Sequence, residues 1–145
     1  MGTQHRKTTR TPLLNDDGHL IEPGYATKLL WDYDRSQIHG GWHRIKEWDY
    51  YYILDQSQQF GVTFTVSDLG YMGLLAVCWL DFSKSEAIQS EATIWFPKGR
   101  LGLPPTSGNG QIAVEHNSLE MEFTYDLPDR HLRIDWAEFK MHGKC

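Results

Sequence analysis

Hydrophobic and polar residues alternate with a period of two over most of the chain from Lys46 onward. The first stretch repeats aromatic or aliphatic residues at every second position: Trp48, Tyr50, Tyr52 and Leu54. Residues 60–66 show the same alternation, and the polar residues 55–58 separate the two stretches. Because alternate side chains of a strand share one face, the pattern predicts two strands joined as a hairpin.

The remainder of the chain continues this pattern. Residues 71–81 are apolar at almost every position, which is typical of a central strand, and residues 119–125 and 132–139 each repeat with period two. Residues 85–93 begin with Ser85 and Glu86, as a helix can, but they run into Ile94 and stop at Pro97. We predict a strand there. Successive strands without helices predict an all-β antiparallel meander, either a barrel or half of a two-part β structure.

The N-terminal region lacks this order. Residues 1–10 are polar and basic and are predicted to be a disordered tail, so the β-rich domain is expected to cover residues 11–145. Turn residues recur at 15–18, 23–24 and 40–41, and only residues 28–33 could form a short strand before Lys46. A long loop is predicted over residues 97–111, which contain two consecutive prolines and four glycines.

Composition excludes several classes of protein. Lys and Arg number 14 against 19 Asp and Glu, a formal net charge of -5, which argues against a nucleic-acid partner. Two cysteines are too few for a disulfide framework. The longest apolar segment, residues 72–80, is far short of the roughly 20 residues of a transmembrane helix. With no signal-like N-terminus, the expected location is cytoplasmic.

Metal and cofactor motifs are weak. His39 and His43 would share a face of a helix, but Gly40 and Gly41 lie between them and no third ligand is near in sequence. Residues 108–113 carry a Gly-Asn-Gly run that resembles part of a dinucleotide fingerprint. That fingerprint needs a strand before it and a helix after it, whereas here a loop precedes and a strand follows. We therefore predict no metal and no cofactor.

The most distinctive chemistry lies in residues 44–53, where charged and aromatic residues mix within one strand. The predicted ligand-binding residues occupy its even-numbered face: Arg44, Lys46, Trp48, Tyr50 and Tyr52. If this face lines an interior, the two cations lie at one end of a row of aromatic side chains. That arrangement suits an amphiphile, whose anionic head would bind the cations and whose tail would contact the rings. The alternative is a surface strand with solvated charges and rings that only pack in a core. Glu47 and Asp49 share the odd-numbered face and could act as paired carboxylates, although simple solvation also explains them.

Three segments carry a resemblance to a known family. They read Leu-Ile-Glu-Pro-Gly-Tyr-Ala at 20–26, Tyr-Asp-Arg at 33–35 and Arg-Ile-Lys-Glu-Trp-Asp-Tyr-Tyr at 44–51. Together they resemble the bacterial family called domain of unknown function 2804, over residues 11–145. That family looks similar to lipocalin-like barrels of the hydroxyneurosporene synthase and tocopherol cyclase type, which handle long apolar molecules. Its members look longer than this chain, so the resemblance implies an N-terminal portion whose partner is a missing C-terminal half. The resemblance implies no catalytic residue.

Three hypotheses of function follow from these patterns. The first is a β-barrel module that binds or processes a lipid-like or other hydrophobic small molecule. The second is an enzyme, such as a hydratase, cyclase or isomerase, on an isoprenoid-type substrate. The third is a structural half-domain whose aromatic residues pack against a partner half. The sequence alone leaves open whether the protein is an enzyme.

Overall fold

The computed structural model describes residues 5–106, 108–126 and 128–137, and the chain divides into two compact units, Met1–Gly40 and Gly41–Cys145. The first unit contains two parallel two-residue strands, β1 (Thr11–Pro12) and β2 (Trp31–Asp32), and a short 3-10 helix, η1 (Arg35–Gln37). The short strand β2 lies within residues 28–33, as predicted, but β1 at Thr11–Pro12 was not predicted. The compact β unit begins at Gly41, whereas the sequence placed the start of the β-rich domain at residue 11.

Part of the predicted disordered tail has a defined place in the first unit. Lys7 donates a backbone hydrogen bond to Tyr25 (2.9 Å), and Tyr25 donates one to His5 (2.9 Å). The Lys7 side chain is buried and its ammonium pairs with Glu22, which lowers the pKa of that carboxyl. These contacts hold His5 and Lys7 in the first unit, and Glu22 supplies the partner that a buried ammonium needs. Residues 1–4 lie outside the described residues.

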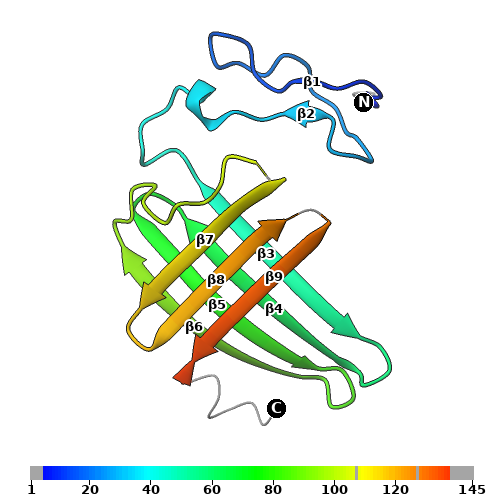
Figure 1. Cartoon of the computed structure of the whole chain (residues 1–145), viewed down its shortest axis with the longest axis vertical. Coiled ribbons are helices and arrows are strands. Elements are labelled where there is room, and N and C mark those ends of the chain that lie inside the picture. The colour runs from blue at the N-terminus through cyan, green and yellow to red at the C-terminus, as the bar shows by residue number, and fades with distance from the viewer. Residues whose placement is uncertain (1–4, 107, 127, 138–145) are drawn as a thin grey trace. The chain divides into compact units, whose positions relative to one another are not determined.

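The second unit is a meander of seven antiparallel strands in two sheets (Figure 1). The four-stranded sheet contains β3 (Glu47–Asp55), β4 (Phe60–Asp68), β5 (Met72–Asp81) and β6 (Glu86–Trp95). The three-stranded sheet contains β7 (Asn109–His116), β8 (Leu119–Asp126) and β9 (Asp129–Trp136). Each strand pairs with the next one along the chain within its sheet. The predicted all-β antiparallel meander is therefore confirmed.

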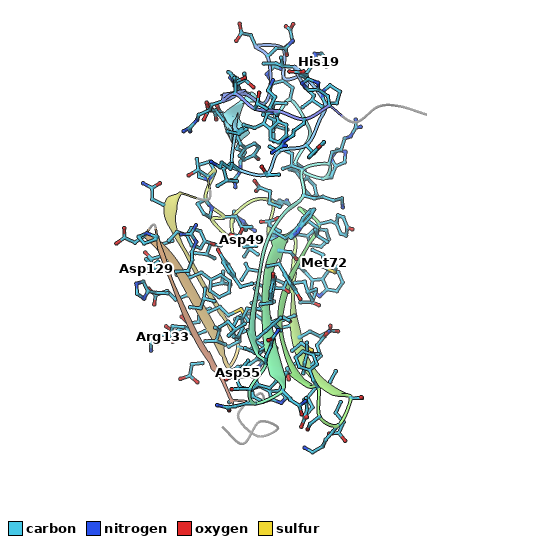
Figure 2. All side chains as sticks on the ribbon, turned by 90° about the vertical axis from the view of Figure 1, so that its right-hand side faces the viewer. His19, Asp49, Asp55, Met72, Asp129 and Arg133 are labelled. Carbon is cyan, nitrogen blue, oxygen red and sulfur yellow. The ribbon has the colours of Figure 1, made fainter. Side chains whose placement is uncertain are left out.

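The two sheets pack against each other, with the strands of one crossing those of the other (Figure 1). Figure 2 views them from the side and shows side chains filling the space between them. The buried hydrophobic residues come from both sheets and from one loop: Phe64, Val66, Leu75, Val77, Leu103, Ile112, Val114, Leu119, Met121, Phe123, Tyr125 and Trp136. Among the described residues, the strands form separate sheets and do not close into a barrel.

The segment with mixed helix and strand signals is a strand, as predicted. β6 pairs with β5 over its whole length, from Glu86 opposite Asp81 to Trp95 opposite Met72. The polar residues before β6 form the connecting turn, where Asp81 accepts hydrogen bonds from Ser83 and Lys84. These bonds, chiefly from Lys84, lower the pKa of Asp81 to about 2. Ser85 has a positive φ of 56° in this turn and does not begin a helix.

The predicted long loop closes one end of the sandwich. It runs from the end of β6 to Asn109, where β7 begins, and its Leu103 is buried in the core. Asp68, at the end of β4, is also buried, and it accepts hydrogen bonds from the backbone nitrogens of Gly70 (2.8 Å) and Leu101 (3.5 Å). These bonds satisfy a buried carboxylate and tie the loop to the β4–β5 turn.

Candidate functional site

The two faces of β3 have different surroundings. Tyr51 lies opposite Phe64 and Asp49 lies opposite Val66, and both partners belong to the core. The odd-numbered residues of β3 therefore face the other sheet, and the even-numbered residues face outward. The predicted ligand-binding residues do not line an interior, because the register of β3 on β4 turns them to the outside of the four-stranded sheet.

The outer side of β3 carries a continuous row of exposed rings. Trp48, Tyr50 and Tyr52 have exposed fractions of 63%, 53% and 65%. The β4 residues opposite them are small and polar: Ser67, Thr65 and Thr63. Small neighbours leave the faces of the rings open. Large exposed apolar patches of this kind mark binding or interaction sites in folded proteins.

One end of this row is closed by two further apolar side chains. A Cβ atom at Gly61 would lie 2.9 Å from Cδ2 of Leu54 and 3.1 Å from the ring of Phe82. Leu54 lies opposite Gly61 on β3, and Phe82 follows β5. The glycine therefore lets side chains from two strands meet over β4 on the outer face.

The other end of the row carries cations. The Lys46 ammonium lies 3.4 Å from the hydroxyl of Tyr71 and 4.5 Å from the centre of its ring, which fixes the cation beside an aromatic face. Arg44 precedes it and is exposed. Since a strand rises about 3.4 Å per residue, the row from Lys46 to Tyr52 is about 20 Å long. The structure thus places Trp48, Tyr50 and Tyr52 on the outer face of β3 with Lys46 just before the strand, whereas Arg44 lies in the preceding turn.

The inner side of β3 holds a polar contact that sequence reasoning missed. The Tyr125 hydroxyl donates a 2.5 Å hydrogen bond to Oδ2 of Asp49, across the space between the sheets. Burial raises the pKa of Tyr125, and the hydrogen bonds with Asp49 and Tyr51 raise it further. Tyr51 also packs its ring against Phe123 at 5.3 Å. The parity of Asp49 within β3 was visible in the sequence, but its partner 76 residues away was not.

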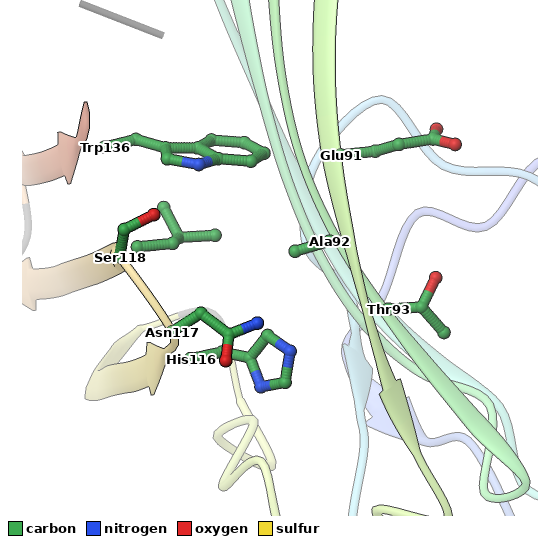
Figure 3. A pocket seen from close by; sticks show the side chains of 8 residues that line it. Glu91, Ala92, Thr93, His116, Asn117, Ser118 and Trp136 are labelled. Atoms are coloured by element: carbon green, nitrogen blue, oxygen red, sulfur yellow. The ribbon is translucent and has the colours of Figure 1, made fainter. Parts of the chain in front are cut away.

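A small hollow lies at the edge of the sandwich beside β6 (Figure 3). It has a volume of about 200 Å³. Ala92 and the indole of Trp136 point into it from opposite sheets, and His116 and Asn117 stand at the β7–β8 turn. Pockets for drug-sized ligands usually measure about 300–1,000 Å³. The hollow is therefore too small for the long amphiphile that the sequence predicts.

The described part of the chain contains no cluster of three or more His, Cys, Asp or Glu side chains arranged to hold a metal ion. It also contains no helix with the length and apolarity needed to cross a membrane.

Comparison with known proteins gives one match. A family model described as "Domain of unknown function (DUF2804)" matches residues 4–144. No curated protein and no solved structure matches the chain.

Proposed function

The chain belongs to the DUF2804 family, and we propose that it binds a long apolar molecule with an anionic group along the outer face of β3. The observation that supports this proposal is the exposed row of Trp48, Tyr50 and Tyr52, which ends at the cation of Lys46. The rings would contact the apolar chain, and the ammonium would contact the anionic head. A row of about 20 Å suits an extended ligand better than a compact one.

The open face is a better candidate than the space between the sheets. That space is filled by fully buried side chains such as Phe123, Met121 and Leu75, so it offers no room for a lipid tail. The family resemblance implies lipocalin-like binding inside a barrel. We propose instead that the ligand binds on the outside of a sheet.

The geometry supports binding more than catalysis. An enzyme would need an acid or base within hydrogen-bond reach of the ligand. Glu47 and Asp49 lie on the inner face of β3, whereas the row lies on the outer face. Asp49 also already accepts the hydrogen bond of Tyr125. The carboxylates would therefore not meet a ligand bound along the row.

Oleate, kept below its micelle concentration, provides a direct test. Indole fluorescence of the chain, which holds six Trp, should change on binding, and Trp48→Phe should remove most of that change. Lys46→Met keeps the aliphatic stem but removes the charge. Because this cation is partly open to water, we expect affinity to fall about five- to tenfold.

Lys84→Met is the matched control. It removes the same charge from a lysine that pairs with Asp81 in the β5–β6 turn, away from the row, and should leave oleate affinity unchanged. An equal loss from both variants would show a general charge effect, and no fluorescence response in the folded wild-type chain would overturn the proposal. Self-association that is abolished by Trp48→Ser would instead identify the row as a packing surface, in line with the half-domain hypothesis.

A further inference from the structure

A second group of exposed residues gathers at the end of the four-stranded sheet where β5 begins. Three segments converge there: residues 41–46, residues 69–72 around the β4–β5 turn, and residues 95–100, which begin with the last residue of β6. Lys98 donates a backbone hydrogen bond to the Gly70 carbonyl (3.0 Å), and Phe96 donates one to the Tyr71 carbonyl (3.0 Å). Gly70 has a φ of +81°, and a Cβ atom there would lie 2.3 Å from the Trp42 carbonyl oxygen. We call this group the basic corner.

The basic corner combines exposed rings with positive charge. Its exposed aromatic residues are Trp42, Tyr71, Trp95 and Phe96. Its cations are Arg44, Lys46, Lys98 and Arg100, and its three segments contain no Asp or Glu. Glu47 and Asp68 adjoin these segments, but both lie on the inner face of the sheet, where Asp68 is buried. The corner is thus locally basic in a protein of net charge -5.

The rings and cations of the basic corner are held in place rather than free. The Lys98 ammonium lies 5.2 Å from the centre of the Trp42 ring, and the rings of Trp95 and Phe96 are 6.5 Å apart. Arg100 donates side-chain hydrogen bonds to the carbonyls of Pro97 (2.9 Å) and Phe96 (3.1 Å). These contacts fix the loop that carries the exposed rings.

The backbone of this loop is strained. Phe96 and Lys98 have positive φ values of 54° and 57°, which L-residues with bulky side chains seldom adopt. Strained backbone that the surrounding contacts maintain is common at functional sites. Here it keeps Trp95 69% exposed and Phe96 54% exposed next to Lys98.

We infer that the basic corner docks this chain on a negatively charged lipid surface. Trp and Tyr favour the membrane–water interface, where one part of the ring is apolar and the other is hydrated. Lys and Arg near an anionic bilayer are attracted to its negative surface potential. Protruding rings among cations match such a surface, because the rings can enter the interface while the cations meet the anionic headgroups. The inference stands on residues 95–100 and Trp42 and does not depend on the ligand proposed for β3.

Vesicle co-sedimentation of the full chain tests this inference. Vesicles of phosphatidylcholine with a third of phosphatidylglycerol should bind the chain, vesicles of phosphatidylcholine alone should bind it much less, and added NaCl should weaken binding. Lys98→Gln should weaken binding about fivefold, from the attraction per cation near such a surface. Trp95→Ser should weaken it by a similar factor, because a buried ring face is lost.

The two controls lie outside the basic corner and outside the β3 row. Lys84→Gln removes the same charge from an exposed lysine in the β5–β6 turn, and Leu29→Ser removes an apolar side chain that is 78% exposed in the first unit. Both variants should bind vesicles like the wild type. Far-UV circular dichroism should show that all four variants keep the fold.

Several results would overturn the inference. One is the absence of binding to anionic vesicles, and another is an equal loss of vesicle binding in the corner variants and the controls. A third is displacement of the chain from vesicles by soluble polyglutamate at low concentration, which would show that any polyanion is enough. Dimerisation of the wild type that is lost in Trp95→Ser would also overturn it, because the corner would then bind a second copy. A failed oleate titration with intact vesicle binding would remove only the function proposed for β3.

Discussion

The inner and outer faces of the four-stranded sheet are built from the same strands but differ in almost every property. On the inner face, Val66, Leu75 and Val77 are completely buried against the second sheet. On the outer face, Trp48 and Tyr52 of β3 remain more than 60% exposed. Aromatic residues on a solvent-exposed sheet face add less to folding than buried ones, and their presence there is what supports the binding role that we propose.

The polar groups differ between the two faces as well. The inner face holds its carboxylates in fixed hydrogen bonds: Asp49 with Tyr125, and Asp68 with the backbone of Gly70. On the outer face, the ammonium of Lys46 rests against the ring of Tyr71 and stays open to water. Buried polar groups must be satisfied within the protein, whereas exposed ones can still take a ligand. Stability and binding should therefore respond to different substitutions.

The largest effect is expected from the centre of the inner face. Phe123→Ala removes a completely buried ring that packs on Tyr51, and should lower the free energy of unfolding by about 3–5 kcal/mol. Tyr52→Ala removes a ring of similar size from the outer face and serves as the control. Urea unfolding followed by circular dichroism measures both. Similar losses from the two variants would contradict the division between a core face and a binding face.

The polar contact of the inner face should contribute less. Tyr125→Phe leaves the ring in place but removes the hydroxyl that binds Asp49, so the partly buried carboxylate loses a partner. We expect a loss of about 1–3 kcal/mol in unfolding free energy. Tyr50→Phe deletes the same hydroxyl from an exposed ring and should change stability little. If Tyr125→Phe were as stable as the wild type, the contact would have no structural role.

The same tyrosine predicts a dependence on alkaline pH. The pKa of Tyr125 is raised in the folded chain, whereas in the unfolded chain it is about 10. Above about pH 10 the unfolded state therefore binds fewer protons than the folded state, and stability falls as pH rises. Below that pH the contribution is complete. The unfolding free energy, measured from pH 8 to 11, should fall less steeply with pH in Tyr125→Phe than in the wild type. Equal pH dependence in the two proteins would show that Tyr125 is not the group responsible.

The strands could be predicted from the sequence, because alternation of side chains is a local property. The strand prediction was confirmed even for β6, although Ser85 and Glu86 resemble the start of a helix. Pairing with β5 outweighs the local helix propensity there. Alternation also grouped Lys46, Trp48 and Tyr52 on one face. It could not say whether that face points inward, because both faces of β3 carry aromatic residues and only the register on β4 distinguishes them.

Contacts between segments that are far apart in the chain could not be predicted from the sequence. The Asp49–Tyr125 bond depends on how two separate sheets cross, and the basic corner depends on three loops that meet at one end of a sheet. The sequence did show that residues 95–100 combine aromatic and basic residues. However, the prediction treated them as the end of a strand and the start of a loop, and did not relate Lys98 to Trp42.

The smallest effect on stability is expected from the exposed ring of Trp48 on the outer face, where a substitution should instead weaken binding. Trp48→Ser removes an indole that is 63% exposed and lies opposite the small residue Ser67, so no cavity forms and no buried group loses a partner. The unfolding free energy should change by no more than about 0.5 kcal/mol, as for most surface substitutions. Oleate affinity should nevertheless fall severalfold, because the ring contacts the apolar chain in the proposed complex. Urea unfolding and isothermal titration calorimetry with oleate can measure the two quantities separately, without relying on the fluorescence of Trp48. A loss of more than 2 kcal/mol in stability would mean that Trp48 packs as a core residue, and the outer face would then have to be regarded as part of the fold.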